Sequence, residues 1–105
     1  MTYNNRTIIF SNDEFVAYKD KLVNKCFAIL GIYEDCEKKT IFEPYITYID
    51  RIKIELIGLY NNTNNVQLIS VINILAGMQE VNSITHKKVK SLVFHIISTI
   101  QKMEV

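Results

Sequence analysis

The clearest candidate for binding chemistry in this sequence is a cluster of basic side chains, His86, Lys87, Lys88 and Lys90. The apolar pattern that follows predicts a helix beginning here. Positive charge at a helix N-terminus interacts unfavourably with the helix dipole. A bound phosphate or carboxylate would offset this repulsion, because the free N–H groups of the helix end and the lysines could both bind the anion. These residues are therefore a candidate anion-binding site that could touch a nucleic-acid backbone. We favour the simpler interpretation, a solvated basic turn that costs roughly a few tenths of a kcal/mol.

Sequence-specific nucleic-acid binding is disfavoured by charge and composition. The chain carries a net charge of only +1, whereas nucleic-acid-binding domains usually have a clearly basic footprint. Its only arginines are Arg6 and Arg51, and lysines alone read base edges poorly. No helix-turn-helix pattern with a glycine-centred turn is evident. Nucleic acid is therefore the less favoured partner.

The residues that could support catalysis do not form a convincing set. His95 lies one helical turn from Ser91 and from Thr99, but no carboxylate is spaced to orient it as in a triad. His86 and His95 are more than two turns apart, too far to share a metal ion. Metal-binding and phosphate-binding motifs such as C-x-x-C, H-E-x-x-H and a glycine-rich loop are missing. We therefore expect no enzyme activity, catalytic residue, metal, cofactor or small-molecule substrate.

The composition predicts a single all-α domain over residues 1–105. Hydrophobic residues make up 49% of the chain, and only one proline and three glycines interrupt it, which favours a few long helices over a β fold. Cys26 lies at a helical core spacing and Cys36 in a charged stretch, so we expect two free thiols. The sequence shows neither a signal peptide nor a membrane span. These features predict a cytoplasmic protein with no membrane partner.

Periodic apolar residues mark the first two expected helices. Thr7–Phe10 is a short apolar run, either extended or leading into a helix. Ser11 to Glu14 matches a capping box before an amphipathic helix of about 20 residues, which should end near Gly31 or between Glu34 and Lys39. Thr40 to Glu43 matches a second capping box. The next helix then continues to a loop at Asn61–Asn65, although the alternation over 51–56 would also suit a strand.

Two further helices complete the expected fold. One spans Val66–Gln79, and the other follows a cap at Ser83 or Thr85 and continues nearly to the C-terminus. Their short connections predict a small antiparallel four-helix bundle in an up-down-up-down arrangement, with a short extended N-terminal segment as a further element.

The most informative feature is the absence of any charged residue from Leu56 to Gln79. A surface helix normally carries charges on its outer side. The third helix instead places small or uncharged groups there, and charges are depleted from the cores of protein interfaces. We therefore predict a partner interface at Gln67, Ser70, Asn73, Ile74 and Gly77, although a helix covered by its own chain or a merely polar surface explains the pattern equally well.

These observations favour a non-enzymatic protein–protein interaction module. Its partner would be another protein, or a second copy in a homo-oligomer. In size and expected architecture alone, the chain resembles small helical bacterial proteins that dock onto other proteins, such as bacteriocin-immunity proteins, phage accessory proteins and small subunits of defence complexes. The hypothesis is therefore a small helical subunit or adaptor of a larger bacterial or phage-related complex. The alternative is a weak nucleic-acid or anion-binding module that uses the basic cluster.

Overall fold

Four helices and a short β-hairpin make up the fold. The computed structural model of the chain describes residues 2–4, 7–9 and 12–103. The strands β1 (Thr2–Asn4) and β2 (Thr7–Ile9) pair antiparallel, with Tyr3 opposite Ile8. The helices are α1 (Asn12–Lys39), α2 (Glu43–Thr63), α3 (Gln67–Met78) and α4 (His86–Lys102). The all-α bundle and the extended N-terminal segment are both confirmed.

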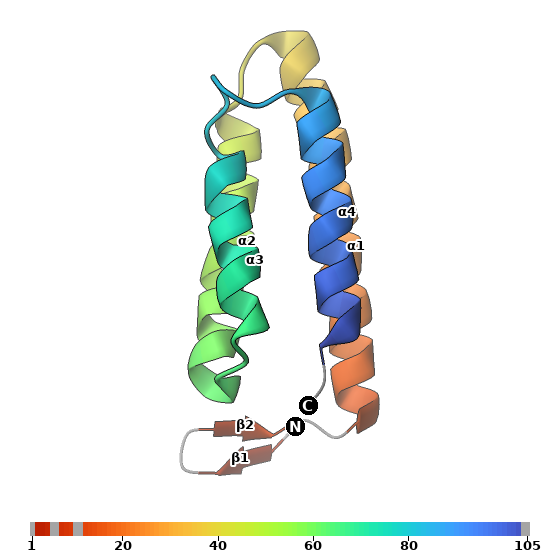
Figure 1. The fold of residues 1–105 in the computed structure, drawn as a ribbon, viewed down its shortest axis with the longest axis vertical. Coiled ribbons are helices and arrows are strands. Elements are labelled where there is room, and N and C mark those ends of the chain that lie inside the picture. The colour runs from red at the N-terminus through yellow and green to blue at the C-terminus, as the bar shows by residue number, and fades with distance from the viewer. Residues whose placement is uncertain (1, 5–6, 10–11, 104–105) are drawn as a thin grey trace.

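The helices run alternately up and down in the predicted antiparallel arrangement (Figure 1). Helix α1 packs against α4 and α2, α3 packs against α2 and α4, and the hairpin lies at one end of the bundle, where β2 contacts α2. The molecule is elongated, with extents of 46 × 20 × 19 Å. Every helix therefore has two helical neighbours and one side that faces outward.

The core consists of the apolar stripes that the helical spacing marks. Each helix contributes fully buried side chains, for example Ile29, Ile49, Val71 and Ile96. Burying one such side chain contributes about 1.5–3 kcal/mol. This packing matters because many of the core residues are β-branched and have modest helix propensity of their own.

Helix α1 is longer than the predicted 20 residues or so and ends at Lys39, the far end of the charged stretch. It continues because Tyr33 and Cys36 are both buried and extend the apolar stripe past Gly31. The capping box predicted at Ser11 lies outside the described residues.

The capping box predicted at Thr40 is wrong. Thr40 adopts a left-handed backbone conformation with φ 55°, and its hydroxyl donates a hydrogen bond to the Lys39 carbonyl. The N-cap of α2 is Phe42, which makes no side-chain cap, and Pro44 lies in the first turn as expected. Thr40 thus takes part in the chain reversal after α1 and does not start α2.

The loop predicted at Asn61–Asn65 is shorter than expected, because α2 continues to Thr63. Thr63 helps to extend the helix by donating a hydrogen bond from its hydroxyl to the Leu59 carbonyl. Asn64 then ends α2 in a left-handed conformation, with φ 55°. Short amide side chains tolerate that conformation, which is why the asparagine run predicts a turn here.

The remaining sequence alternatives are resolved in favour of helices. The alternating run over 51–56 lies within α2, and Ile54 points outward with 64% of its surface exposed. Thr85 is the N-cap of α4, and its hydroxyl accepts a hydrogen bond from the Lys88 amide.

Cys26 and Cys36 are free, buried thiols.

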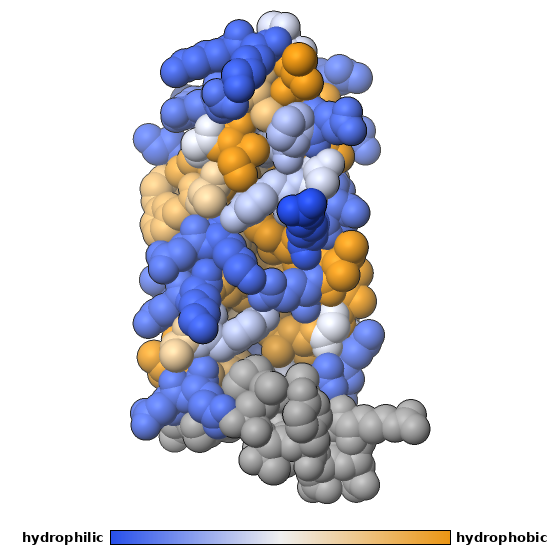
Figure 2. Space-filling view, turned by 180° about the vertical axis from the view of Figure 1, so that it is seen from behind, coloured by the Kyte–Doolittle hydropathy of each residue, from blue (hydrophilic) through white to orange (hydrophobic). Residues whose placement is uncertain are grey.

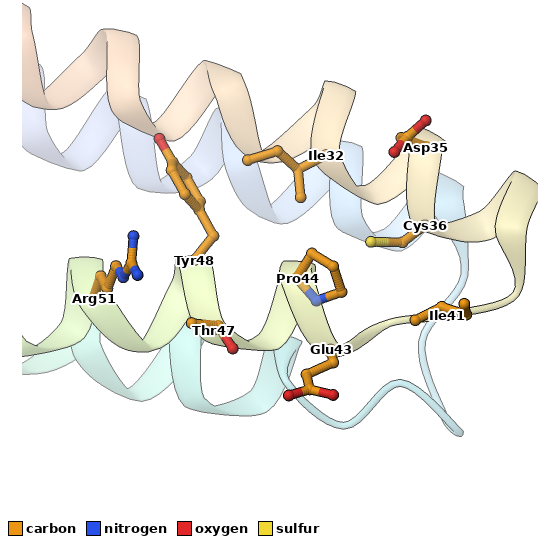
Figure 3. Close-up of a pocket in the computed structure, with 9 residues that line it drawn as sticks. All are labelled: Ile32, Asp35, Cys36, Ile41, Glu43, Pro44, Thr47, Tyr48 and Arg51. Carbon is orange, nitrogen blue, oxygen red and sulfur yellow. The ribbon is translucent and has the colours of Figure 1, made fainter.

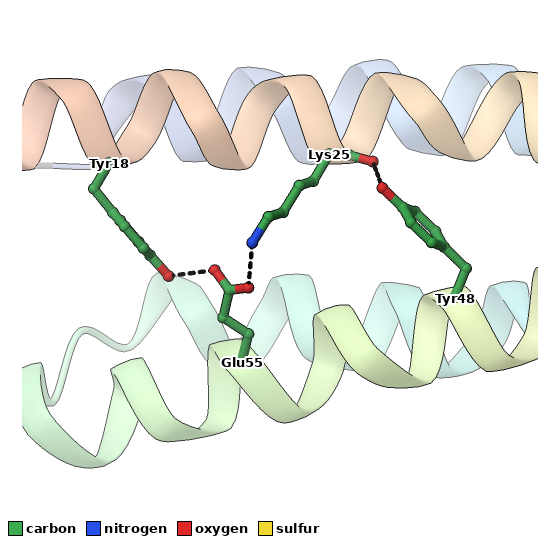
Figure 4. A network of polar contacts seen from close by, with 4 residues as sticks. All are labelled: Tyr18, Lys25, Tyr48 and Glu55. Atoms are coloured by element: carbon green, nitrogen blue, oxygen red, sulfur yellow. Dashed lines mark hydrogen bonds and ion pairs between the residues drawn. The ribbon is translucent and has the colours of Figure 1, made fainter.

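A polar network joins α1 to α2 (Figure 4). Glu55 accepts a 2.7 Å hydrogen bond from the Tyr18 hydroxyl and pairs with Lys25 at 2.6 Å, while Tyr48 donates to the Lys25 carbonyl. Burial alone would raise the pKa of Glu55, but the hydrogen bonds from Lys25 and Tyr18 outweigh it and lower the pKa below its usual value. The network fixes the register of α2 against α1.

Polar groups dominate the side of the molecule formed by α1 and α2. Figure 2 shows hydrophilic side chains over most of this side, with apolar atoms in separate patches between them. Among the residues that the structure describes, no helix combines the length and the apolar character needed to cross a bilayer.

Candidate interaction surface on helices α2 and α3

Helix α3 turns one stripe inward and the opposite stripe toward solvent. Leu68, Val71, Leu75 and Met78 recur every three or four residues and are all buried. This spacing leaves the predicted interface residues on the other side of the helix. We call these residues the α3 face: Gln67, Ser70, Asn73, Ile74 and Gly77.

The structure leaves the α3 face uncovered. Gln67, Ser70, Asn73 and Gly77 are exposed, and Ile74 is half-buried. The interpretation of α3 as a helix covered on both sides by its own chain is therefore wrong for the described residues. An interface and a merely polar surface remain as the two explanations of the missing charges.

Exposed apolar side chains also occur at α3 and on α2, the helix packed against it. Val66, the N-cap of α3, is 70% exposed, and Ile69 of α3 is 41% exposed. On the neighbouring helix α2, Ile57 is 44% exposed. All three lie in the stretch without charges. Exposed aliphatic groups beside small, uncharged polar groups form the kind of mixed surface found at the centre of protein interfaces.

Ile57 is the apolar contributor that sequence reasoning missed. The core stripe of α2 passes through Ile52, Leu56 and Leu59, and Ile57 lies to one side of it. A helical projection of the sequence would have placed Ile57 off that stripe, but it could not have shown that 44% of its surface is exposed.

Hydrogen bonds from α2 fix the orientation of α3. The buried Tyr45 hydroxyl donates to the Met78 carbonyl at 2.7 Å. Gln79 donates to the Ile46 carbonyl at 3.0 Å and accepts from Lys53 at 2.6 Å. These contacts hold the C-terminal end of α3 against α2, so the α3 face is carried on a fixed helix.

A shallow groove of about 270 Å³ runs between α3 and α4. Asn73, Ile74 and Gly77 line it from α3, and Lys88 and Leu92 line it from α4. The groove therefore connects the α3 face to one member of the predicted anion site. The two candidate sites are neighbours in the fold, which sequence reasoning did not anticipate.

The predicted anion site is only partly brought together. His86 faces α1, where its Nε2 lies 3.2 Å from Glu34 Oε1 and its ring stacks on Tyr33 at a centroid distance of 5.9 Å. Lys88 instead lines the groove beside α3. Lys87, Lys88 and Lys90 are exposed. His86 and Lys88 thus face different helices and do not converge on one ligand position.

The positive charge at the N-terminus of α4 is compensated by a carboxylate of the same chain. The Glu34 carboxylate of α1 lies beside His86, the first residue of α4. The Thr85 hydroxyl satisfies one of the free amides of this helix end. A negative group near a helix N-terminus is what the dipole favours. The basic cluster therefore needs no bound anion to explain it.

The candidate catalytic side chains stay on the surface of α4. His95 and Ser91 are exposed, and Thr99 donates its hydroxyl hydrogen bond to the His95 backbone carbonyl. No group of three or more histidine, cysteine or acidic side chains that could hold a metal ion occurs in residues 13–103. Whether the chain has enzyme activity is untested, and its absence stays a prediction.

Comparisons of the chain with protein-family models, with curated proteins and with solved structures found no match.

Proposed function

We propose that the chain is a non-enzymatic protein–protein interaction module that binds its partner protein through the α3 face and the adjoining apolar residues Ile57, Val66 and Ile69. The observation that carries this proposal is the exposure of three aliphatic side chains within a stretch of the chain that carries no charged residue. Water hydrates such a surface poorly. Burying it against a partner would stabilise the complex by about 25 cal/mol for each Å² of apolar area removed from water.

The small residues of the α3 face support the proposal in a second way. Ser70 and Gly77 project little from the helix, so a partner backbone can approach closely, while Gln67 and Asn73 can both donate and accept hydrogen bonds. The fixed attachment of α3 to α2 also means that little ordering entropy is lost on binding.

In this proposal the chain is a small helical subunit or adaptor of a larger bacterial or phage-related complex, of the kind used in defence or immunity. Its richness in Ile, Asn, Lys and Tyr, typical of AT-rich coding sequences, supports that origin. The exposed groups of the α3 face fit a protein partner better than a small molecule, because they form a broad surface instead of an enclosed pocket.

The test compares partner binding by the tagged protein and two variants, Ser70→Arg and Asn73→Arg. Each places a charged, bulky side chain at the centre of the α3 face. Complexes are purified from an extract of the source cells after nuclease treatment and weighed by native mass spectrometry. We expect a defined complex for the wild type and its loss for both variants, with unchanged helicity and melting temperature.

Matched controls carry the same substitutions on other exposed surfaces. Ser91→Arg on α4 and Asn24→Arg on α1 should retain the complex, because both residues are exposed on other helices and neither belongs to the α3 face. A wild-type protein that stays a bare monomer would contradict the proposal. So would Ser70→Arg and Asn73→Arg variants that fold normally and keep the complex.

A further inference from the structure

A second surface lies on a different side of the molecule, at a groove of about 560 Å³ between α1 and α2. Figure 3 shows Ile32 of α1 and Pro44 and Tyr48 of α2 pointing into the space between the two helices. These apolar groups form the floor of the groove. Two further aliphatic side chains are exposed near it, Ile41 in the α1–α2 connection at 60% and Ile54 on α2 at 64%.

Charges of opposite sign stand at the two ends of this groove. Arg51 lines one end, and Asp35 and Glu43 line the other (Figure 3). Within the part of the chain that the structure describes, Arg51 and Glu43 form no ion pair, whereas Asp35 pairs with Lys39 at 3.1 Å. Arg51 and Glu43 are both on α2, about 12 Å apart along its axis at a rise of 1.5 Å per residue.

This arrangement is complementary to itself. If a second copy packs with its α2 antiparallel to the first, a twofold axis near Thr47 places Arg51 of each copy opposite Glu43 of the other. The same alignment brings Ile41 of one copy toward Ile54 of the second. An isologous contact always pairs a patch with itself, so charged groups within it are favourable where opposite signs stand on either side of the axis.

We propose that the groove between α1 and α2 is a self-association surface through which two copies form an antiparallel, twofold-symmetric dimer. The net charge of +1 gives little repulsion between copies. Helix α2 is about 32 Å long and the bundle is 19–20 Å wide. The area available for contact is therefore at most roughly 600 Å² on each copy, at the low end of specific interfaces. Because area alone does not set affinity, we take weak association, with a dissociation constant on the order of 10 μM, as the expectation to be measured.

The proposal is tested by reversing charges one at a time and together. Arg51→Glu and Glu43→Arg should each raise the dimer dissociation constant by about a hundredfold or more, because each places like charges opposite one another at two points. The double variant Arg51→Glu/Glu43→Arg restores both pairs and should dimerise like the wild type. An equimolar mixture of the two single variants should form mixed dimers, since every contact in it joins opposite charges.

Sedimentation equilibrium measures each of these states, and native mass spectrometry identifies mixed dimers when one variant is isotopically labelled. Asp20→Arg and Lys90→Glu, at exposed positions on α1 and α4, are the matched controls and should dimerise normally. A wild type that stays monomeric at concentrations well above the expected dissociation constant would overturn the proposal. Single variants that still dimerise, or a mixture that does not, would overturn it equally. These results are independent of the α3 face, which the Ser70→Arg variant tests.

Discussion

The hydroxyl of Tyr45 donates a hydrogen bond of 2.7 Å to the backbone carbonyl of Met78, and both residues are fully buried. Tyr45 is in the first turn of α2, and Met78 is the last residue of α3. The contact therefore joins the beginning of one helix to the end of the next. Burial raises the pKa of the Tyr45 hydroxyl, so it stays protonated and able to donate.

Replacing Tyr45 by phenylalanine should lower the free energy of unfolding by about 1–3 kcal/mol, because it leaves the buried Met78 carbonyl without its donor. Urea denaturation followed by circular dichroism measures this change. Tyr60→Phe is the control, since the half-buried Tyr60 hydroxyl makes no hydrogen bond to any of the residues that the structure describes. Equal losses for the two variants would show that the Tyr45 bond contributes nothing specific.

The hydrogen bonds of Glu55 should make the free energy of unfolding depend on pH. The pKa of Glu55 is lowered in the folded state, so the folded protein binds fewer protons than the unfolded chain near the usual pKa of 4.5. The stabilisation is thus fully present above that pKa and is lost as the pH falls through the lower folded-state value. Because Glu55 is partly exposed, we expect about 1 kcal/mol.

Urea denaturation between pH 3 and pH 7 tests this dependence in Glu55→Gln and Glu80→Gln. Glu55→Gln should be less stable than the wild type at neutral pH, and the difference should shrink in acid. Glu80→Gln removes an exposed carboxylate on the connection to α4 and should follow the wild-type curve. A constant difference for Glu55→Gln across the range would contradict the proposed linkage.

The apolar spacing was enough to predict four helices and their arrangement, because burial of stripes such as Leu68, Val71 and Leu75 decides which side of a helix faces inward. Local signals near helix ends were less reliable. Thr40 has the sequence pattern of a capping box, yet the reversal between α1 and α2 requires it in a left-handed conformation. Packing of the whole chain outweighs a local hydrogen bond worth about 1 kcal/mol.

The sequence predicts a candidate site only where its residues belong to one helix and not where they come from distant parts of the chain. The exposed stripe of α3 follows from its own sequence, which is why the helical spacing predicts the residues of the α3 face. The pairing of His86 with Glu34 joins residues far apart in the chain, so no local pattern signals it. The groove floor between Ile32 and Tyr48 likewise depends on how α1 and α2 align, which the sequence does not specify.

The thiol of Cys26 should be unreactive in the folded protein. Burial raises the pKa of Cys26 to about 12, and the nearby negative charge of Glu55 adds to this effect. At pH 8 only about one thiol in ten thousand is then ionised. In a Cys36→Ala variant, disulfide exchange with an aromatic disulfide reagent should be at least about a thousandfold slower than in urea. A native rate within tenfold of the unfolded rate would show that Cys26 is accessible.

Substituting Gly77 should change the stability of the bundle and its proposed partner binding in opposite directions. A Cβ atom added at Gly77 meets no heavy atom within 4 Å, and φ is not positive there, so Gly77→Ala should stabilise the fold by about 0.5–1 kcal/mol. Gly31→Ala on α1 meets the same conditions and should stabilise it similarly. If the partner backbone approaches the α3 face closely, only Gly77→Ala should weaken the complex, by about tenfold for one misplaced methyl group. Thermal unfolding and titration of the purified partner measure the two effects, and equal binding by both variants would mean that the partner does not contact Gly77.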